Sequence, residues 1–155
     1  MLFRSSMTVL FWLYYDSQDG PVFTYWTRQK RQFVIKILKK KVVARFRKGD
    51  HLETYPALKS SSLTPGWIFV GASYNRSSGE AKVWVDGDVV GEENIGNDFE
   101  LDSQNNVTMG ASMSNGSYFK GRITQMQVYN LALTQGQIQA IQHQVSHSGK
   151  KASHS

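Results

Sequence analysis

The chain has 155 residues, 40% of them hydrophobic and 12% aromatic, which is enough apolar material for the core of one domain. Lys and Arg outnumber Asp and Glu by 18 to 12, and the resulting net charge of +6 permits an anionic partner without requiring one. The sequence has no apolar run of about 18 residues, so we predict no membrane span. It also has no cysteine, which excludes disulfide frameworks, zinc–thiolate sites and thiol nucleophiles.

The amino end contains an apolar run at 9–15 that superficially resembles a secretory signal. The run is aromatic rather than rich in Leu or Ala, and it leads into the turn cluster 16–21 instead of a small-residue cleavage site. We therefore expect a buried strand followed by a loop.

Further short apolar runs alternate with turn signals at a spacing typical of β-sandwiches. The expected strands are 8–15, 22–27, 33–38, 42–47, 67–75, 81–86, 107–110 and 121–129. In the strand 42–47, alternation places Val42, Ala44 and Phe46 on one face and Arg45 and Arg47 on the other. One face of that strand is predicted to be core and the other to face solvent.

A hairpin is predicted where Asp86-Gly87 separates two β-branched runs, because Gly accepts a positive φ without steric cost. Asp86 is accordingly interpreted as a turn residue and not as a ligand.

Helical periodicity occurs near the carboxyl end. Thr134 to Gln137 reads as a capping box, and Ile138, Ile141 and Val145 follow at spacings of three and four, as in a short amphipathic helix that lies on the sandwich. The polar stretch 147–155 is predicted to be a disordered tail. The chain is therefore expected to be one domain, 1–146, followed by that tail.

Several blocks of this sequence, in this order, resemble the laminin-G-like and pentraxin-like domains of the concanavalin A-like lectin/glucanase superfamily. The blocks are TVLFWL at 8–13, GWIFV at 66–70, KVWVDG at 82–87, VTMG at 107–110, FKGRI at 119–123 and VYNLALT at 128–134. The resemblance implies an all-β fold, a two-sheet antiparallel jelly-roll sandwich with a short C-terminal helix. It also implies one or two further strands before residue 8 that this chain lacks, so the strand 121–129 is expected at an uncovered sheet edge. A fragment, a truncated gene product and a part of a larger protein all fit this pattern.

The same resemblance implies that two features of pentraxins are lost. The Asp-Asn pair that holds calcium falls on Arg31 and Gln32, and the second ligand cluster falls on residues 110–114, which offer no carboxylate. The two disulfide cysteines fall on Leu10 and Gly71. We predict no metal site and no other cofactor; an edge calcium site of the laminin-G kind at Asp98 and Asp102 is an alternative to a solvated acidic rim.

No catalytic constellation is found, and we predict a protein that is not an enzyme. The nearest glycosidase-like pattern, Glu100-x-Asp102, has Asn105 where a second carboxylate is required. The four histidines show no metal-ligand spacing on a convincing element, and the chain has no Gly-x-Ser-x-Gly elbow and no phosphate loop.

The strongest functional signal is a basic segment at 28–48, with ten Lys and Arg and no acid, while the rest of the chain is net negative. We predict an anionic-ligand site whose residues are Lys36, Lys39, Lys40, Lys41, Arg45 and Arg47. The family resemblance favours a sulfated glycan. The alternative is a lysine-blunted edge hairpin that prevents aggregation between sheets. Nucleic acid is not expected, because Phe33 and Phe46 fall on apolar faces and cannot stack on bases.

Two further features concern sugars. Tyr15, Tyr25, Trp26 and Tyr118 lie near strand ends or loops and are candidate platforms for a sugar ring. Asn75, Asn106 and Asn115 begin Asn-x-Ser/Thr sequences and are predicted N-glycosylation sites, which favours an extracellular or secreted setting.

The function predicted from the sequence is a non-catalytic extracellular recognition module that binds anionic glycans through the basic hairpin. Two alternatives remain open: a structural or protein–protein adhesion module of a larger extracellular or receptor protein, and a lectin for neutral sugars.

Overall fold

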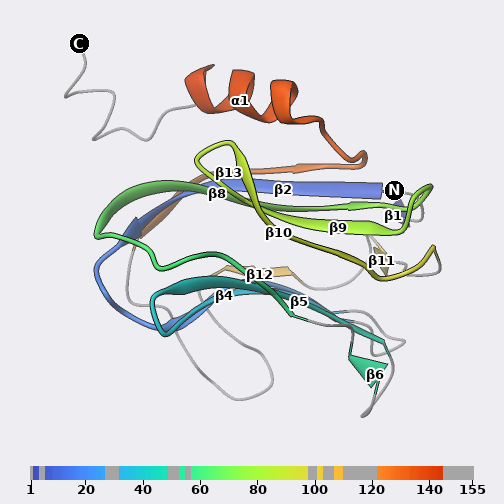
Figure 1. The fold of residues 1–155 in the computed structure, drawn as a ribbon, viewed down its shortest axis with the longest axis horizontal. Helices are drawn as coiled ribbons and strands as arrows, with labels where there is room; N and C mark the ends of the chain where they lie inside the picture. Colours follow the sequence, from blue (N-terminus) through green and yellow to red (C-terminus); the bar gives the residue numbers. More distant parts are fainter. Residues whose placement is uncertain are drawn as a thin grey trace.

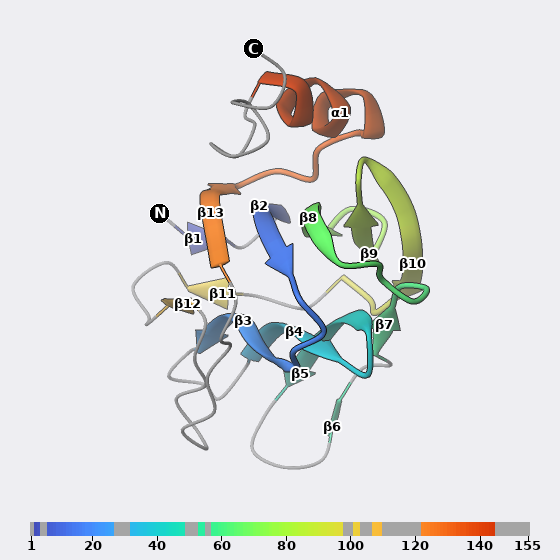
Figure 2. The same ribbon diagram turned by 90° about the vertical axis from the view of Figure 1, so that its left-hand side faces the viewer.

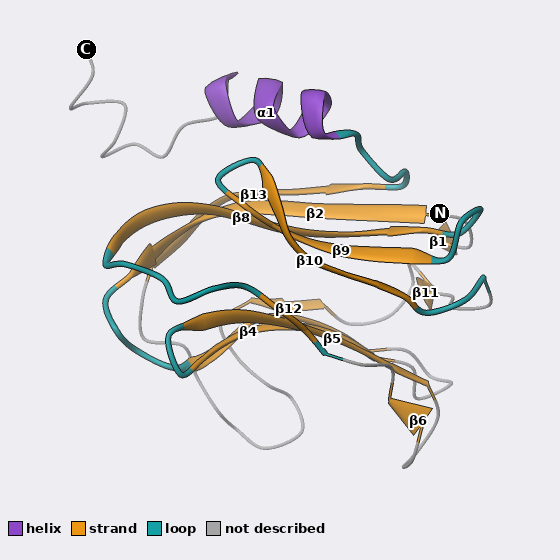
Figure 3. Cartoon of the chain, in the orientation of Figure 1, coloured by secondary structure: helices purple, strands orange, loops and turns teal. Residues whose placement is uncertain are grey.

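The protein is a sandwich of two antiparallel sheets with one helix on its outside (Figures 1 and 2). The computed structural model describes residues 2–3, 6–26, 32–48, 53–54, 57–97, 101–102, 107–109 and 122–144. Figure 3 shows the layers, with α1 (Gln135–Gln144) outside one of them. The predicted fold class is confirmed.

The first sheet has five strands in the order β10-β9-β8-β2-β13. Their bounds are β2 Ser6–Tyr15, β8 Gly66–Asn75, β9 Glu80–Val85, β10 Asp88–Asn94 and β13 Arg122–Tyr129. Among the described residues β13 pairs only with β2, so it lies at the sheet edge where the sequence placed it.

The second sheet has six strands in the order β12-β3-β4-β5-β6, with β7 also paired to β5. Their bounds are β3 Gly20–Trp26, β4 Gln32–Leu38, β5 Lys41–Lys48, β6 Glu53–Thr54, β7 Leu58–Lys59 and β12 Val107–Met109. A separate short pair joins β1 (Leu2–Phe3) to β11 (Leu101–Asp102).

The core lies between the two sheets and follows from strand alternation. Phe11 and Leu13 of β2 meet Phe33 and Ile35 of β4 in one buried cluster. The strand β2 is apolar on both faces because a second cluster covers its outer face. That double burial explains the continuous apolar run at 9–15 and confirms that this run is a strand.

The helix α1 covers the outer face of the five-stranded sheet. Ile138 is fully buried against Trp12, Phe69 and Trp84, and Ile141 is partly buried beside them. The helix begins with the predicted capping box: the Thr134 N–H donates to Gln137 Oε1 at 2.9 Å, and the Gln137 N–H donates to Thr134 Oγ1 at 3.2 Å. Val145 and the predicted tail 147–155 lie outside the described residues.

Leu10 and Gly71, the two positions that the resemblance assigned to a disulfide, are direct cross-strand partners. A Cβ atom on Gly71 would lie 2.4 Å from Leu10 Cδ2 and 2.7 Å from the Val9 carbonyl oxygen. Leucine on one strand therefore fills the space that the glycine on the other leaves open, and apolar packing occupies the place of the bridge.

In the part of the chain that the structure describes, no helix has the length and apolarity needed to cross a membrane.

Candidate ligand-binding surfaces

The basic hairpin is formed by β4 and β5 and lies inside the six-stranded sheet. β4 pairs with β3 on its other side, and β5 pairs with β6 and β7. Beyond β7, the Ser60 N–H donates to the Val42 carbonyl at 2.9 Å, and the Val42 N–H donates to Ser60 Oγ at 2.9 Å. The alternative interpretation of these lysines as protection of an exposed sheet edge is therefore wrong, because the chain after β6 returns to cover β5.

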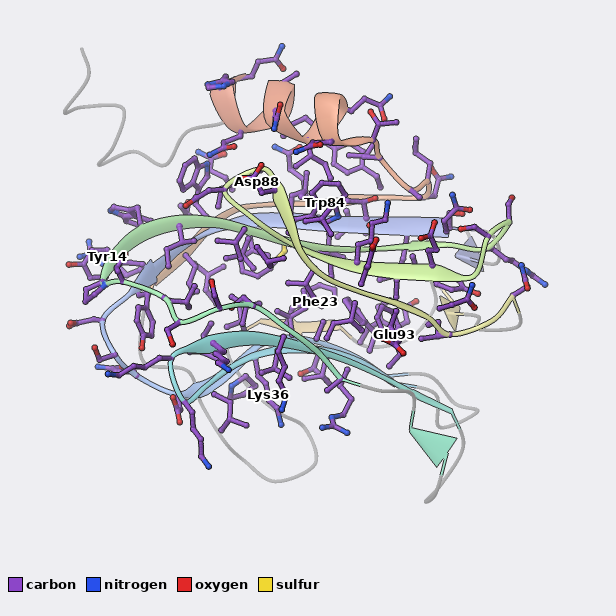
Figure 4. All side chains as sticks on the ribbon, in the orientation of Figure 1. Tyr14, Phe23, Lys36, Trp84, Asp88 and Glu93 are labelled. Carbon is purple, nitrogen blue, oxygen red and sulfur yellow. The ribbon has the colours of Figure 1, made fainter. Side chains whose placement is uncertain are left out.

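The predicted core face of this hairpin is confirmed, but its other face is not open to solvent throughout, because Val43 there is only 2% exposed. Val42, Ala44 and Phe46 are fully buried in the core, whereas Lys41 and Arg45 point to the outer face of the sheet and are half-buried. Lys36 of β4 is also half-buried on this face, and Figure 4 shows its side chain pointing away from Phe23 and the core. Arg47 lies on β5 in register with Gln32, but its side chain is outside the described residues.

The tip of the hairpin is the two-residue turn Lys39-Lys40, and both side chains are exposed. Both residues have positive φ, 50° and 67°, as type I′ turns require. Such turns favour Asn and Gly, because a larger L-residue is strained in the left-handed region. The Asp19 carboxylate accepts a hydrogen bond from the Lys39 N–H at 3.1 Å and helps to hold the turn.

The structure adds Lys59 to this surface. Val43 pairs with Lys36 on one side and with Lys59 on the other, and paired residues point to the same face of a sheet. Lys36, Val43 and Lys59 thus form a row across three strands, and the exposed Lys59 lies about 10 Å from Lys36 at the usual strand spacing. Sequence periodicity could not identify Lys59, because β7 has only two residues and pairs with β5 through the fold.

We define the basic surface as the outward side chains of the β4–β5 hairpin and its neighbour β7: Lys36, Lys39, Lys40, Lys41, Arg45 and Lys59. The Nε of Arg45 is buried and has no hydrogen-bond partner among the described residues. Acidic side chains are concentrated in the other sheet, on β9, β10 and the turn between them: Glu80, Asp86, Asp88, Glu92 and Glu93.

Asp86 is a turn residue, as predicted. Asp86 and Gly87 have φ of 52° and 85° in the β9–β10 turn. Asp86 Oδ1 accepts the Phe69 N–H at 3.0 Å, and the Asp86 N–H donates to the Phe69 carbonyl at 2.7 Å. The side-chain carboxylate and the backbone N–H of Asp86 thus both connect the turn to the neighbouring strand β8.

The predictions about calcium sites rest mostly on residues that the structure does not describe. Among the described residues, no group of three or more His, Cys, Asp or Glu side chains is placed to hold a metal ion. Asp98, Arg31 and residues 110–114, as well as the side chains of Gln32 and Asp102, are outside the described residues, so the predictions made on them remain predictions.

The aromatic platforms predicted from the sequence are corrected by the structure. Tyr15 and Tyr25 are only 1% and 3% exposed in the core, so they cannot stack on a sugar; the side chain of Trp26 and all of Tyr118 lie outside the described residues. Partly exposed rings occur instead at Tyr14 and Trp67, but the guanidinium of Arg122 covers them, 4.8 and 5.7 Å from their ring centroids.

One of the three predicted glycosylation sites can be located. Asn75 ends β8 and is half-buried, and its Oδ1 accepts the backbone N–H groups of Ser77 and Ser78 at 2.9 and 3.4 Å. Asn106 and Asn115 lie outside the described residues. Glycosylation remains a prediction at all three positions.

Several solved structures share this fold at low sequence identity. A heptameric SAP-like pentraxin from Limulus polyphemus is 15% identical with a TM-score of 0.69, and the match covers 88% of this chain and 69% of the pentraxin. A putative carbohydrate binding protein from Bacteroides ovatus is 17% identical with a TM-score of 0.68 over 90% of this chain and 41% of its own. The CBM40 of the Ruminococcus gnavus IT-sialidase, solved with α2,3-sialyllactose, is 18% identical with a TM-score of 0.66. That match covers 88% of this chain and 82% of the CBM40 chain.

The comparison with curated proteins finds no match for this sequence. Residues 2–139 match the profile of the family described as the concanavalin A-like lectin/glucanases superfamily, in its Laminin_G_3 branch. The order of the strands, the two-sheet sandwich and this match over most of the chain agree, and the chain belongs to the concanavalin A-like lectin/glucanase superfamily.

Proposed function

We propose that this chain is a non-catalytic carbohydrate-recognition module that binds a sulfated or otherwise anionic glycan through the basic surface. The observation that carries the proposal is the separation of charge between the sheets. Lys36, Arg45 and Lys59 share one outer face with the lysine tip, while most of the described acidic side chains lie on β9, β10 and the turn between them. The exceptions are Asp16 and Asp19 in the loop before β3, of which Asp19 accepts the Lys39 N–H, and the surfaces meet where the Lys59 backbone packs against Gly91.

The comparisons support a carbohydrate as the ligand class. The family is described as lectins and glucanases, one structural neighbour is a putative carbohydrate binding protein, and another was solved with sialyllactose, an acidic sugar. Because the neighbours that the comparisons name are a pentraxin and carbohydrate-binding proteins, binding without turnover is the activity we propose.

The geometry favours an extended polyanion. Lys36 and Lys59 are aligned across the strands, and the tip lysines continue the positive surface along them. Each exposed ion pair contributes about 0.2–1 kcal/mol and is weakened by salt, so affinity depends on several simultaneous contacts. Arg45 and Arg47 add guanidinium groups that can hold two oxygens of one sulfate.

The strained turn supports the same proposal. A turn of two lysines with positive φ is less favourable than Asn-Gly, and unfavourable backbone conformations are concentrated at functional sites. The turn places two ammonium groups at the most projecting part of the hairpin. We further propose an extracellular or secreted setting, in which sulfated glycans and the three predicted glycosylation sites would both be found.

The test is retention on immobilised heparin, compared with retention on a sulfopropyl cation exchanger, for the native chain and a Lys39→Glu/Lys40→Glu/Lys41→Glu variant. A matched control, Arg76→Glu/Lys82→Glu/Arg122→Glu, changes the net charge by the same amount on or next to the five-stranded sheet and not on the hairpin. We expect the hairpin variant to lose heparin affinity by about tenfold or more, and the control to lose much less. Circular dichroism checks that all three proteins are folded.

Equal loss in the two variants would show that heparin senses only net charge, and the proposal would fail. A structural or protein–protein adhesion role would then move ahead, and one observation already favours it. Val128 on the edge strand β13 and Leu131 just after it are 45% and 43% exposed. Among the described residues β13 pairs with β2 on one side and has no partner strand on the other, so this apolar edge could receive a protein partner.

A further inference from the structure

One arginine of the five-stranded sheet lies against two aromatic rings, apart from the basic surface. Arg122 of β13 pairs with Tyr14 of β2, and Tyr14 pairs with Trp67 of β8, so the three side chains form a row across three strands. Figure 4 shows Tyr14 at the left end of the sandwich and Lys36 in the other sheet, on the underside. We call Arg122, Tyr14 and Trp67 the arginine cluster.

The two rings hold the guanidinium of Arg122 in place. Its central carbon lies 4.8 Å from the ring centroid of Tyr14 and 5.7 Å from that of Trp67. The rings contact each other edge to face, with centroids 5.4 Å apart, and Trp67 also packs against the buried cluster beneath α1. Part of the rotamer freedom of Arg122 is therefore already lost before any ligand arrives, which lowers the cost of binding.

The guanidinium remains accessible and has no counter-charge in the part of the chain that the structure describes. Arg122 is exposed, and no described carboxylate lies within ion-pair distance of it. The rings cover a planar face of the guanidinium, whereas its five N–H donors point outward in the plane. The cluster thus presents a fixed fork of donors that has no acidic partner among the described residues.

Apolar surface lies next to this charge. Tyr14 and Trp67 are both partly exposed, and the partly buried Ile141 of α1 packs against the same cluster beneath the helix as Trp67 does. Trp, Tyr and Arg are the residue types that contribute most of the binding energy at protein–protein interfaces. A single cation among exposed apolar groups is therefore the composition expected of a protein contact.

We propose that the arginine cluster docks a protein partner through one Asp or Glu side chain that is flanked by apolar residues. A carboxylate matches the planar fork of Arg122 with two parallel hydrogen bonds, and the rings and Ile141 match the apolar neighbours. A polyanion is disfavoured, because the cluster has one positive charge and the exposed Asp16 follows Tyr14 by two residues. This inference does not rest on glycan binding by the other sheet.

The test is an NMR titration of the native chain with the blocked peptide acetyl-Leu-Glu-Leu-amide. The matched probe is acetyl-Leu-Gln-Leu-amide, which has the same shape without the charge. We expect the Glu peptide to give saturable shifts at the Arg122 Nε–H and the Trp67 indole N–H, with a Kd on the order of 1 mM. The Gln peptide should bind at least about tenfold more weakly, because the charge-assisted hydrogen bonds are lost.

Three variants locate the site. Arg122→Gln should raise the Kd for the Glu peptide at least about tenfold, and Arg122→Lys, which keeps the charge but not the planar fork, should raise it about threefold. The matched control is Lys82→Gln, because Lys82 lies on the same face of the sheet and also over an indole ring, 5.9 Å from the centroid of Trp84. That change should leave the Kd unchanged.

The inference is overturned if the Glu peptide gives no saturable shifts, if the two peptides bind alike, or if Lys82→Gln weakens binding as much as Arg122→Gln does. It is also overturned if a heparin tetrasaccharide shifts the same resonances at lower concentration, or if they shift with protein concentration alone, as self-association would cause. Heparin retention should be equal for Arg122→Gln and Lys82→Gln, so its loss in the hairpin variant is scored separately. Failure of one site is thus distinguished from failure of the other.

Discussion

The β4–β5 and β9–β10 hairpins have the same turn and opposite chemistry. Each is closed by two residues with positive φ: Lys39-Lys40 in one and Asp86-Gly87 in the other. Asp-Gly suits this geometry, and Asp86 also accepts the Phe69 N–H. Lys-Lys does not suit it, and the hairpin is held by contacts from elsewhere in the chain.

Those contacts come from two loops. Asp19 accepts the Lys39 N–H, the Leu63 N–H donates to the Lys40 carbonyl at 2.7 Å, and Ser60 bonds to both polar backbone groups of Val42. Both turns therefore receive hydrogen bonds from other segments, but only the Asp86-Gly87 turn also has residues that suit its backbone geometry. The two lysines are therefore not explained by a fit to the turn, and the binding role proposed above would give a reason for their presence.

The largest effect on stability is expected from Asp86→Ala. The change leaves the Phe69 N–H without its acceptor and puts alanine in the left-handed region, for a combined cost of about 2 kcal/mol in the free energy of unfolding. Urea denaturation measures this cost. Asp88→Ala, which removes an exposed hydrogen bond to Gln135, is the control and should cost well under half as much. Similar costs for both would show that the turn carboxylate is not special.

A smaller effect of opposite sign is expected from Lys39→Asn/Lys40→Gly. The new residues suit a type I′ turn, so the protein should become more stable by about 1 kcal/mol. Heparin retention should decrease at the same time, because two charges leave the basic surface. A variant that is neither stabilised nor weakened in binding would contradict the idea that charge is kept here at the expense of turn geometry.

The smallest effect is expected from Glu92→Gln/Glu93→Gln on the acidic hairpin. The net charge becomes more positive by two, yet the hairpin that carries the proposed heparin site lies on the other sheet. Retention on heparin and on the cation exchanger should increase slightly and by the same amount, because only the overall charge has changed. A selective gain on heparin would show that the acidic hairpin takes part in glycan binding.

Much of the fold could be predicted from local pattern. Each of the eight strands expected from the sequence corresponds to a strand of the structure, and the capping box and the Asp86-Gly87 turn occur as predicted. The resemblance placed Leu10 and Gly71 as partners, and the register confirms it. The strand β10 was expected only as the second arm of the Asp86-Gly87 hairpin. The short strands β1, β6, β7 and β11 were missed, because two residues carry no periodic signal.

The residues of the candidate sites were harder to predict from the sequence than the strands were. The outward direction of Lys36, Lys41 and Arg45 followed from alternation, but the burial of Tyr15 and Tyr25 did not, because residues near strand ends can point into the core or to the rim. Lys59 joins the basic surface through pairing between segments that are distant in the chain. A pocket of about 300 Å³ forms in the same way between β8, β9, β10 and residues 132–135, and no local signal identifies either feature.

The sequence by itself determined the two-sheet class, the alternation within strands, the helix start and the concentration of positive charge in one segment, because each depends on neighbours along the chain. The tertiary structure decided that the basic hairpin is central and not at an edge, which residues join it, and where a pocket forms. These properties depend on which strands pair, and pairing is set by the packing of the whole core.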